Sequence, residues 1–255
     1  MIAPATIKPI VSSTGHDELS VMCSAAAEAG ADLLDVGGVK AGPGPEVGEA
    51  EELDRVIPAI EALSGRYDTP LSVDTWRASV ARAAFEAGAV VGNDISGFAD
   101  PDYLDAAADH GATVVATHIR LGPRIPDPEP VYDDVVGTVE AFLLERAERA
   151  LAAGLTPDRI VIDAGLDLGK TASQSLTLLR ASDRLADLGY PLLLSASNKT
   201  FLGVVLGLEI GHRREASLAA TSLGAALGCR VMRVHEAGAH HQACDVLTAI
   251  GRARR

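Results

Sequence analysis

Six short apolar runs in this chain each end on a polar or titratable residue, and this repeated pattern limits the folds that the chain can adopt. The runs lie at 33–38, 71–75, 90–94, 114–118, 159–163 and 230–235. A charge at the tip of an otherwise apolar strand is costly to bury. Parallel α/β proteins place their functional residues at the carboxyl ends of their strands. The pattern therefore predicts a parallel α/β fold with its polar residues at the strand ends.

Strand and helix signals alternate along the whole chain. We expect strands at Ala5–Ser12, Ala31–Val36, Pro70–Asp74, Ala89–Asp94, Ala112–Thr117, Arg159–Asp163, Tyr190–Ser195 and Cys229–His235. We expect helices at Asp17–Gly30, Glu49–Ser64, Ala78–Gly88, Pro101–Gly111, Asp133–Ala153, Ser173–Leu188, Arg213–Leu227 and Gly238–Arg252. Eight strand–helix pairs predict a (β/α)8 TIM barrel, with residues 1–255 forming a single domain. The alternative, an open doubly wound sheet, would need a GxGxxG turn after its first strand, and the sequence has none there.

Composition excludes several classes of protein. The net charge of −13 argues against a nucleic-acid surface, which needs clustered lysine and arginine. No apolar run approaches the roughly 20 residues of a membrane helix, and the first residues do not resemble a signal peptide. The three cysteines show no CxxC spacing, so we expect reduced, buried thiols and a cytoplasmic protein. His240, His241 and Cys244 have a poor spacing for zinc, and we interpret them as a surface helix end.

The strand ends supply a set of side chains suited to a flat nitrogen heterocycle. Asp74, Asn93 and Asp163 together offer several acceptors and a donor pair, which can read the edge of an aminopyrimidinone ring. Lys199 follows the seventh predicted strand, where it can bind a ring carbonyl, a ring nitrogen or an anionic leaving group. We therefore expect these four side chains to meet at the mouth of the barrel.

Other strand-end residues allow two interpretations. Arg233 and His235 are two positions apart in a strand, so both side chains lie on one face, which we expect to be the barrel interior. Asp35 and Asp94 precede turns that contain glycine; turn capping is favoured for Asp35 and stays open for Asp94. His118, like His235, fits either a satisfied buried imidazole or a functional group.

Two further segments are weaker signals. The stretch Gly165–Thr171, GLDLGKT, resembles a phosphate-binding loop, but its glycines are one residue too close for the GxxxxGK[ST] pattern. The stretch 119–131 is long, irregular and contains four prolines. Loops of that length in compact domains are usually functional or mobile.

Taken in order, the motifs of this chain resemble those of the dihydropteroate synthase family. They cover nearly the whole chain from about Gly30. The strings are DVGG…GPG (Asp35–Gly44), EELDRVIPAIEAL (Glu51–Leu63), LSVDTWRASVARAAFEAGA (Leu71–Ala89), NDISG (Asn93–Gly97), IDAGLDLGKT (Ile162–Thr171), SNKTFLG (Ser197–Gly203) and RVHE (Arg233–Glu236).

The resemblance implies a (β/α)8 barrel, a homodimer and a reaction. The family joins 6-hydroxymethyl-7,8-dihydropterin pyrophosphate to p-aminobenzoate in folate biosynthesis, releasing pyrophosphate with Mg²⁺ assistance. Asp74, Asn93 and Asp163 match the family residues that read the pterin edge, and Lys199 matches the lysine over the pterin ring. The pair Arg233 and His235 matches the residues near the pyrophosphate.

Departures from the family pattern cluster in the loops. The family's NVTPDSF loop, whose asparagine helps to hold metal and pyrophosphate, is IVSSTGHDEL here, at 10–19. The family's ESTRPG loop is VKAGPG, at 39–44, and we expect Lys40 to replace one of the missing loop cations. The family's SRK is Ser197-Asn198-Lys199, and Asp167 stands where a glycine is usual.

These departures predict a divergent paralogue with weak or lost synthase activity. Each lost ligand removes roughly a few kcal/mol of transition-state stabilisation. The acceptor would be p-aminobenzoate or another amine. A non-catalytic pterin-binding homologue is the first alternative. The second alternative is a methyltetrahydrofolate-dependent methyltransferase, against which the SNKTF and RVH strings speak.

Overall fold

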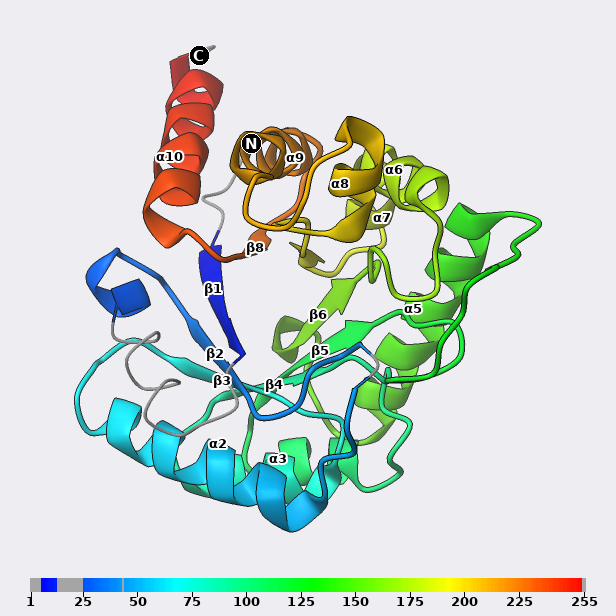
Figure 1. Ribbon diagram of the computed structural model, residues 1–255. Helices are drawn as coiled ribbons and strands as arrows, with labels where there is room; N and C mark the ends of the chain where they lie inside the picture. The colour runs from blue at the N-terminus through cyan, green and yellow to red at the C-terminus, as the bar shows by residue number, and fades with distance from the viewer. Residues whose placement is uncertain (1–5, 13–24, 43, 254–255) are drawn as a thin grey trace.

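The computed structural model describes residues 6–12, 25–42 and 44–253. Its strands are parallel and pair in sequence order, and the pairing of β1 with β8 closes the sheet into a barrel (Figure 1). The strand bounds are β1 Thr6–Ser12, β2 Leu34–Gly37, β3 Leu71–Asp74, β4 Val91–Asp94, β5 Thr113–Thr117, β6 Ile160–Asp163, β7 Leu192–Leu194 and β8 Val231–Val234. The predicted parallel α/β class is confirmed, and each of these strands overlaps a predicted one.

The helices lie outside the ring of strands (Figure 1). Their bounds are α2 Glu49–Ser64, α3 Ala78–Glu86, α4 Tyr103–Asp109, α5 Val135–Ala152, α6 Ala172–Arg180, α7 Ser182–Ala186, α8 Thr200–Leu206, α9 Arg214–Ala226 and α10 Ala237–Ala253, with a 3₁₀ turn η1 at Pro157–Arg159. Among the described helices, none is both long enough and apolar enough to cross a membrane.

The strands divide their side chains between two environments, because successive residues of a strand point to opposite faces. The outward side chains join the large core beneath the helices. The inward ones form a separate apolar layer of Leu33, Val91, Val115, Val161, Leu193 and Val231. Two positions further along each strand, toward its carboxyl end, the inward residues are Asp35, Asn93, Thr117, Asp163, Ser195 and Arg233. A polar layer therefore sits on an apolar floor.

Two helices differ from the sequence prediction. The single helix expected at 173–188 is split into α6 and α7 at Ala181. The Ser182 hydroxyl donates to the Leu179 carbonyl at 2.8 Å, and such side-chain bonds to the backbone compete with helix propagation. Helix α8 was not predicted, because its short apolar sequence has no side-chain cap of its own. The helix expected at 17–30 lies mostly outside the described residues; of those described, 25–28 are helical.

The prediction of a surface helix end around His240 is wrong. His240 and Cys244 are 1% and 5% exposed, because α10 packs against α9 and β1. His241 is half-exposed and its Nε2 lies 3.4 Å from an Asp245 carboxylate oxygen. Cys229 and Cys244 are free and buried, as expected, whereas Cys23 lies outside the described residues.

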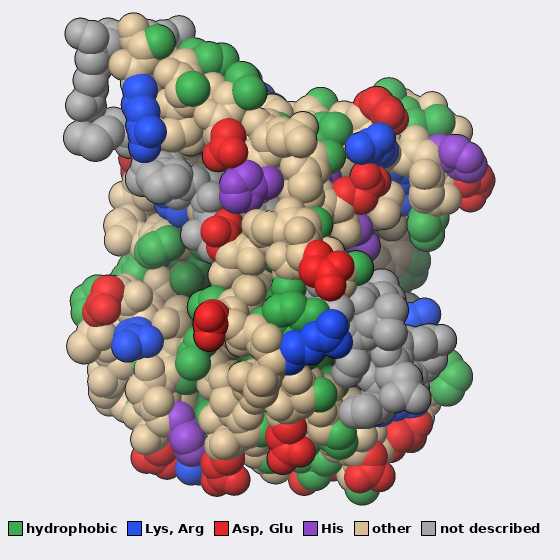
Figure 2. All heavy atoms as spheres, turned by 90° about the vertical axis from the view of Figure 1, so that its left-hand side faces the viewer, with side chains coloured by type: hydrophobic (Ala, Val, Ile, Leu, Met, Phe, Trp, Pro, Cys, Tyr) green, Lys and Arg blue, Asp and Glu red, His purple; other side chains and the backbone are tan. Residues whose placement is uncertain are grey.

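Charged side chains are dispersed over the face shown in Figure 2. Lysine and arginine side chains on this face lie apart from one another, among acidic side chains and the backbone. That face therefore has no continuous basic patch of the kind that binds nucleic acid.

Candidate functional site

Four side chains from four strands form one network inside the carboxyl end of the barrel. Arg233 on β8 places its Nε 2.8 Å from Oδ2 of Asp35 on β2, and its Nη2 donates to the Asp74 carboxylate on β3. On β4, Nδ2 of Asn93 donates to the same Asp35 oxygen at 3.0 Å. Asp35 is fully buried, and Arg233 and Asp74 are mostly buried. The structure thus brings together three predicted site residues and one that was expected to cap a turn.

The turn-capping interpretation is wrong for Asp35 and right for Asp94. Asp35 is two residues after Leu33, which lies in the apolar floor, so its side chain also points into the barrel. Asp94 follows the inward Asn93 and points outward. Its carboxylate accepts backbone N–H groups of Ser96 at 2.6 Å and Phe98 at 2.8 Å. Burial raises the pKa of Asp94 to about 6.

Burial and charge oppose each other within the network. Burial raises the pKa of Asp74 to about 6, although the Arg233 guanidinium acts to lower it. Burial acts to lower the pKa of Arg233, but the carboxylates of Asp74, Asp35 and Asp163 outweigh it, so its net shift is upward. The guanidinium is therefore permanently charged and is shared between two carboxylates.

Asp163 ends β6 beside this network. Its Oδ1 accepts the Gly165 backbone N–H at 2.8 Å, and the residue is only 6% exposed. Burial raises the pKa of Asp163, while the Gly165 bond and the nearby Lys199 and Arg233 lower it in part. The neighbouring inward position on β5, Thr117, has a buried hydroxyl without a hydrogen-bond partner among the described residues. The mouth therefore keeps polar groups that a ligand can satisfy.

Lys199 lies immediately before α8, at its N-cap position. Its backbone N–H donates to the Ala196 carbonyl at 3.3 Å, which closes a tight turn after β7. The side chain is half-buried, and burial lowers its pKa against the opposing charges of Asp167 and Asp163. The charge of Asp163 thus acts on Lys199, and their meeting at a ligand stays a prediction.

His235 and Lys40 lie at the rim. His235 follows β8 and is exposed, and its Nδ1 is 2.9 Å from the Ser197 hydroxyl. Although the residue as a whole is exposed, partial desolvation of its ring, and then the charges of Arg233 and Lys199, lower its pKa. Lys40 is exposed and makes no hydrogen bond or ion pair with any residue that the structure describes. The expectation that Lys40 replaces a loop cation stays a prediction.

Lys170 is a buried lysine that sequence reasoning missed. It is 7% exposed, and its Nζ lies 2.9 Å from His118 Nδ1, 2.8 Å from the Gly165 carbonyl and 3.0 Å from the Leu168 carbonyl. Burial lowers its pKa to about 7. Burial, and then the charge of Lys170, lower the pKa of His118 to about 3, so His118 is a neutral, satisfied imidazole. The Gly169-Lys170 dipeptide in GLDLGKT was the sequence signal for this lysine, but the sequence analysis considered the segment only as a possible phosphate-binding loop.

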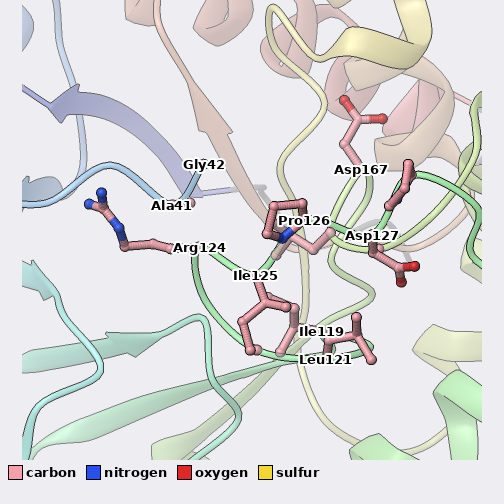
Figure 3. A pocket seen from close by; sticks show the side chains of 13 residues that line it. Ala41, Gly42, Ile119, Leu121, Arg124, Ile125, Pro126, Asp127 and Asp167 are labelled. Atoms are coloured by element: carbon pink, nitrogen blue, oxygen red, sulfur yellow. The ribbon is translucent and has the colours of Figure 1, made fainter. Parts of the chain in front are cut away.

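A pocket of about 300 Å³ lies beside the strand ends and does not include the polar layer (Figure 3). Three loops line it: 41–42 after β2, 119–128 after β5 and 167–169 after β6. In Figure 3, Leu121 and Ile119 lie at the lower edge of the group, whereas the carboxylate of Asp167 points away from them toward the top of the view. The proline-rich loop that the sequence marked as unusual is therefore one wall of a pocket.

Arg124 ties two walls of this pocket together. Its backbone N–H donates to the Ala41 carbonyl at 3.2 Å, and its Nη2 donates to the Gly44 carbonyl at 2.6 Å and to the Pro45 carbonyl. A Cβ added at Gly42 would meet no atom within 4 Å. The loop after β2 is thus anchored by a guanidinium from the loop after β5.

The Asp35 and Asp74 carboxylates do not suit a resident Mg²⁺ ion. Mg²⁺ needs carboxylate oxygens free to enter an octahedral shell. Asp35 and Asp74 share the Arg233 guanidinium, and no group of three His, Cys, Asp or Glu residues that could hold a metal occurs in the described part of the chain. Most of the altered first loop, at 13–19, lies outside the described residues. The expected Mg²⁺ assistance stays a prediction.

Comparisons with known proteins agree with this geometry. A family described as "Pterin binding enzyme" matches residues 17–235. An "Inactive dihydropteroate synthase 2" of Mycobacterium leprae is 45% identical over 233 residues, covering 87% of this chain and 78% of that protein. A dihydropteroate synthase of Synechocystis is 40% identical over 228 residues, covering 88% of this chain and 79% of that protein.

Solved structures lead to the same family. The dihydropteroate synthase of Xanthomonas albilineans in complex with 7,8-dihydropteroate superimposes with a TM-score of 0.88 at 38% identity, covering 98% of this chain and 94% of that one. The similarity spans the strands that carry the polar layer as well as the helices around them. The chain therefore belongs to the pterin-binding enzyme family, as a divergent homologue of dihydropteroate synthase.

Proposed function

We propose that this chain binds a pterin in the polar layer of the barrel. Asp74, Asn93 and Asp163 would read the edge of the ring, and Lys199 would lie over it. The observation that supports this most directly is that these residues, from four separate segments, gather at one mouth above an apolar floor. Such a buried set of donors and acceptors suits a flat polar ring, and the Thr117 hydroxyl beside it has no partner among the residues that the structure describes.

The hydrogen-bonding capacity of the layer matches an aminopyrimidinone edge. Asn93 uses its amide nitrogen on Asp35, which leaves its amide oxygen as an acceptor. Asp163 uses one carboxylate oxygen on Gly165, which leaves the other for a ring N–H. Lys199 is a donor for a ring nitrogen or carbonyl. The layer therefore offers a pterin ring two acceptors, from Asn93 and Asp163, and one cationic donor, from Lys199.

We propose that condensation with an amine is weak or lost. The reaction breaks the bond between the pterin methylene carbon and a pyrophosphate oxygen, forms a bond from that carbon to the amine nitrogen, and releases an amine proton. Pyrophosphate departure needs cations free to take up its charge. Arg233 is already shared between Asp35 and Asp74. The chain thus favours binding over turnover, and a purely pterin-binding role is the alternative.

The pocket lined by 119–128 is our proposed acceptor site. It opens beside Leu168, in the loop that follows Asp163, so an amine held there would lie near the pterin substituent. Its walls include exposed Leu121 and Ile125, which suit an aromatic ring. We expect p-aminobenzoate, or another aromatic amine, to bind there.

A pair of measurements tests the function. Calorimetry with 7,8-dihydropteroate should give a binding heat that Asp163→Ala abolishes and that Asp109→Asn, a carboxylate change at the end of α4, leaves intact. A steady-state assay with 6-hydroxymethyl-7,8-dihydropterin pyrophosphate and p-aminobenzoate should give little or no dihydropteroate. Absence of binding heat in the unmodified chain would overturn the pterin site, and rapid turnover would overturn the loss of activity.

We also propose that residues 1–255 act as one (β/α)8 domain that forms a homodimer. Helix α8 and the segment after it expose four large apolar side chains, Val204, Val205, Leu206 and Ile210, which are 54–74% exposed. Contiguous apolar surface of this kind marks interaction sites on soluble proteins. A second copy of the chain is the partner that the family resemblance implies.

A further inference from the structure

Two oppositely charged side chains hold the short segment that carries Lys199. Arg213, just before α9, donates Nη1 to the carbonyl oxygens of Asn198 at 3.1 Å and Lys199 at 3.2 Å. From the other side, the Asp167 carboxylate accepts the backbone N–H groups of Thr200 and Phe201, the latter at 3.2 Å. Four successive backbone groups are thus fixed by side chains from two other loops.

Arg213 also holds the far end of α8. Its Nε and Nη2 donate to the Leu208 carbonyl at 3.0 and 2.9 Å, and the residue is 7% exposed. A Cβ added at Gly203 would lie 2.2 Å from Nη2 of Arg213, so only glycine lets the helix pack on the guanidinium. One buried cation therefore fastens both ends of the helix that begins after Lys199.

Asp167 reaches the other face of the segment from a strained backbone. Its φ is +68°, in the left-handed region where residues other than glycine are uncommon. Its backbone N–H donates to the Ser175 hydroxyl of α6 at 3.1 Å, which orients the residue. Strained residues persist where surrounding structure determines them, and they cluster at binding sites. The hydrogen bonds from the Asp167 carboxylate to the start of α8 explain why the protein maintains this strained backbone conformation.

We propose that Asp167 and Arg213 are positioning residues for Lys199, fixing its backbone from opposite sides so that its ammonium group faces a ligand in the polar layer. The proposal rests on the proposed pterin site. Arg213 does not line the proposed acceptor pocket, and the carboxylate of Asp167, which does line it, points away from Leu121 and Ile125 (Figure 3). Asp167 would act in two ways, because it caps the start of α8 and also places a negative charge near the ammonium group.

The charges around Lys199 come from several elements. The acidic ones are Asp163 at the end of β6, Asp167 in the loop after β6 and Asp74 on β3. The basic or titratable ones are Lys170 before α6, Arg233 on β8 and His235 after β8. Burial lowers the pKa of Lys199, and Asp167 is the largest of the charges that oppose this. Removing the Asp167 charge should therefore lower the pKa of Lys199 further.

Two substitutions separate these roles without adding backbone strain. Asp167→Gly removes the cap, and glycine tolerates the left-handed conformation. Asp167→Asn keeps an acceptor oxygen and tolerates the same conformation, but it removes the charge. Asp109→Asn is the control, because it removes a carboxylate at the end of α4 that pairs with Arg82 and lies outside the proposed pocket.

The experiment measures 7,8-dihydropteroate affinity by calorimetry across alkaline pH. We expect Asp167→Gly to weaken binding about tenfold, on the scale of a lost helix cap. We expect Asp167→Asn to move the pH at which affinity declines to a lower value, and Asp109→Asn to change neither quantity. Unchanged affinity in Asp167→Gly together with an unchanged pH midpoint in Asp167→Asn would overturn the proposal.

A second measurement keeps the test separate from the proposed function. NMR titration of the lysine side-chain carbons in the ligand-free protein, with Lys199→Met to assign the signal, reports the Lys199 pKa directly. Asp167→Asn should lower it, and Arg213→Lys, which cannot fasten both ends of α8, should broaden or shift the Lys199 signal. If dihydropteroate fails to bind the unmodified chain, the pterin function fails while this titration still decides the positioning role; signals unchanged in both variants would refute it.

Discussion

The Nζ of Lys170 lies 2.9 Å from Nδ1 of His118, deep in the loop that follows Asp163. The same ammonium group bonds the carbonyls of Gly165 and Leu168. One side chain thus satisfies backbone acceptors of a loop that would otherwise bury them without partners. It also fixes the path of the chain after Asp163, the residue whose carboxylate we propose to bind the pterin.

Lys170→Met should destabilise the fold by about 2–4 kcal/mol, because several buried acceptors lose their donor at once. Urea unfolding followed by circular dichroism measures the change. Lys40→Met, at an exposed lysine after β2, is the matched control and should change stability by less than about 0.5 kcal/mol. A Lys170→Met variant as stable as the control would contradict the structural role.

Acid should destabilise the protein partly through His118. Its pKa is about 3 when folded against an ordinary value of 6.5, so the unfolded chain binds the extra proton between these values. This contribution to stability is therefore present above pH 6.5 and is lost as pH falls toward 3. His118→Gln keeps an acceptor near Lys170 but cannot titrate. Its unfolding free energy should fall less steeply between pH 6.5 and 4, and an identical slope would count against the assignment.

Asp35→Asn should strengthen binding of inorganic pyrophosphate several-fold. The substitution removes one of the two carboxylates that share the Arg233 guanidinium, which leaves that cation with less compensating charge. Calorimetry with pyrophosphate measures the effect. Asp94→Asn serves as the control because, within the described part of the chain, the Asp94 carboxylate bonds its own turn and not Arg233. Weaker or unchanged binding in Asp35→Asn would show that Arg233 does not face the leaving group.

Val205→Asp should dissociate the proposed homodimer. Val205 is 54% exposed within the apolar surface of α8, and a buried unpaired charge at an interface is costly. Sedimentation velocity compares its mass with that of the unmodified chain. Val246→Asp, at a similarly exposed valine of α10, should leave the assembly unchanged. A monomeric unmodified chain, or an unaffected Val205→Asp variant, would exclude this surface.

The sequence predicts the strands better than the loops because strand periodicity is a local property. Position at the carboxyl end of a strand placed Asp74, Asn93 and Asp163 at the mouth, and alternation placed Arg233 on the inward face of its strand, where the structure has it. The same rule assigns Asp35 to the interior, but the glycines after it suggested a turn instead. Where periodicity and turn chemistry disagree inside a barrel strand, periodicity is the better guide.

Contacts between loops are what the sequence could not supply. The cap that Asp167 provides for α8 joins residues 33 and 34 positions apart, so no local pattern around α8 indicates where that helix begins. Arg213 and Arg124 likewise act on backbone carbonyls of other segments. Backbone carbonyls are common to all residues, and their partners are therefore invisible in a sequence.

The apolar floor beneath the polar layer has an evolutionary consequence. Leu33, Val91, Val115 and Leu193 pack together beneath the polar layer and belong to a cluster distinct from the core under the helices. Substitutions at the rim need not disturb that packing. Mutations in the outer loops can therefore abolish catalysis in one lineage, while selection for a stable fold preserves the apolar floor and the polar layer above it. The preserved site is then available for a new ligand.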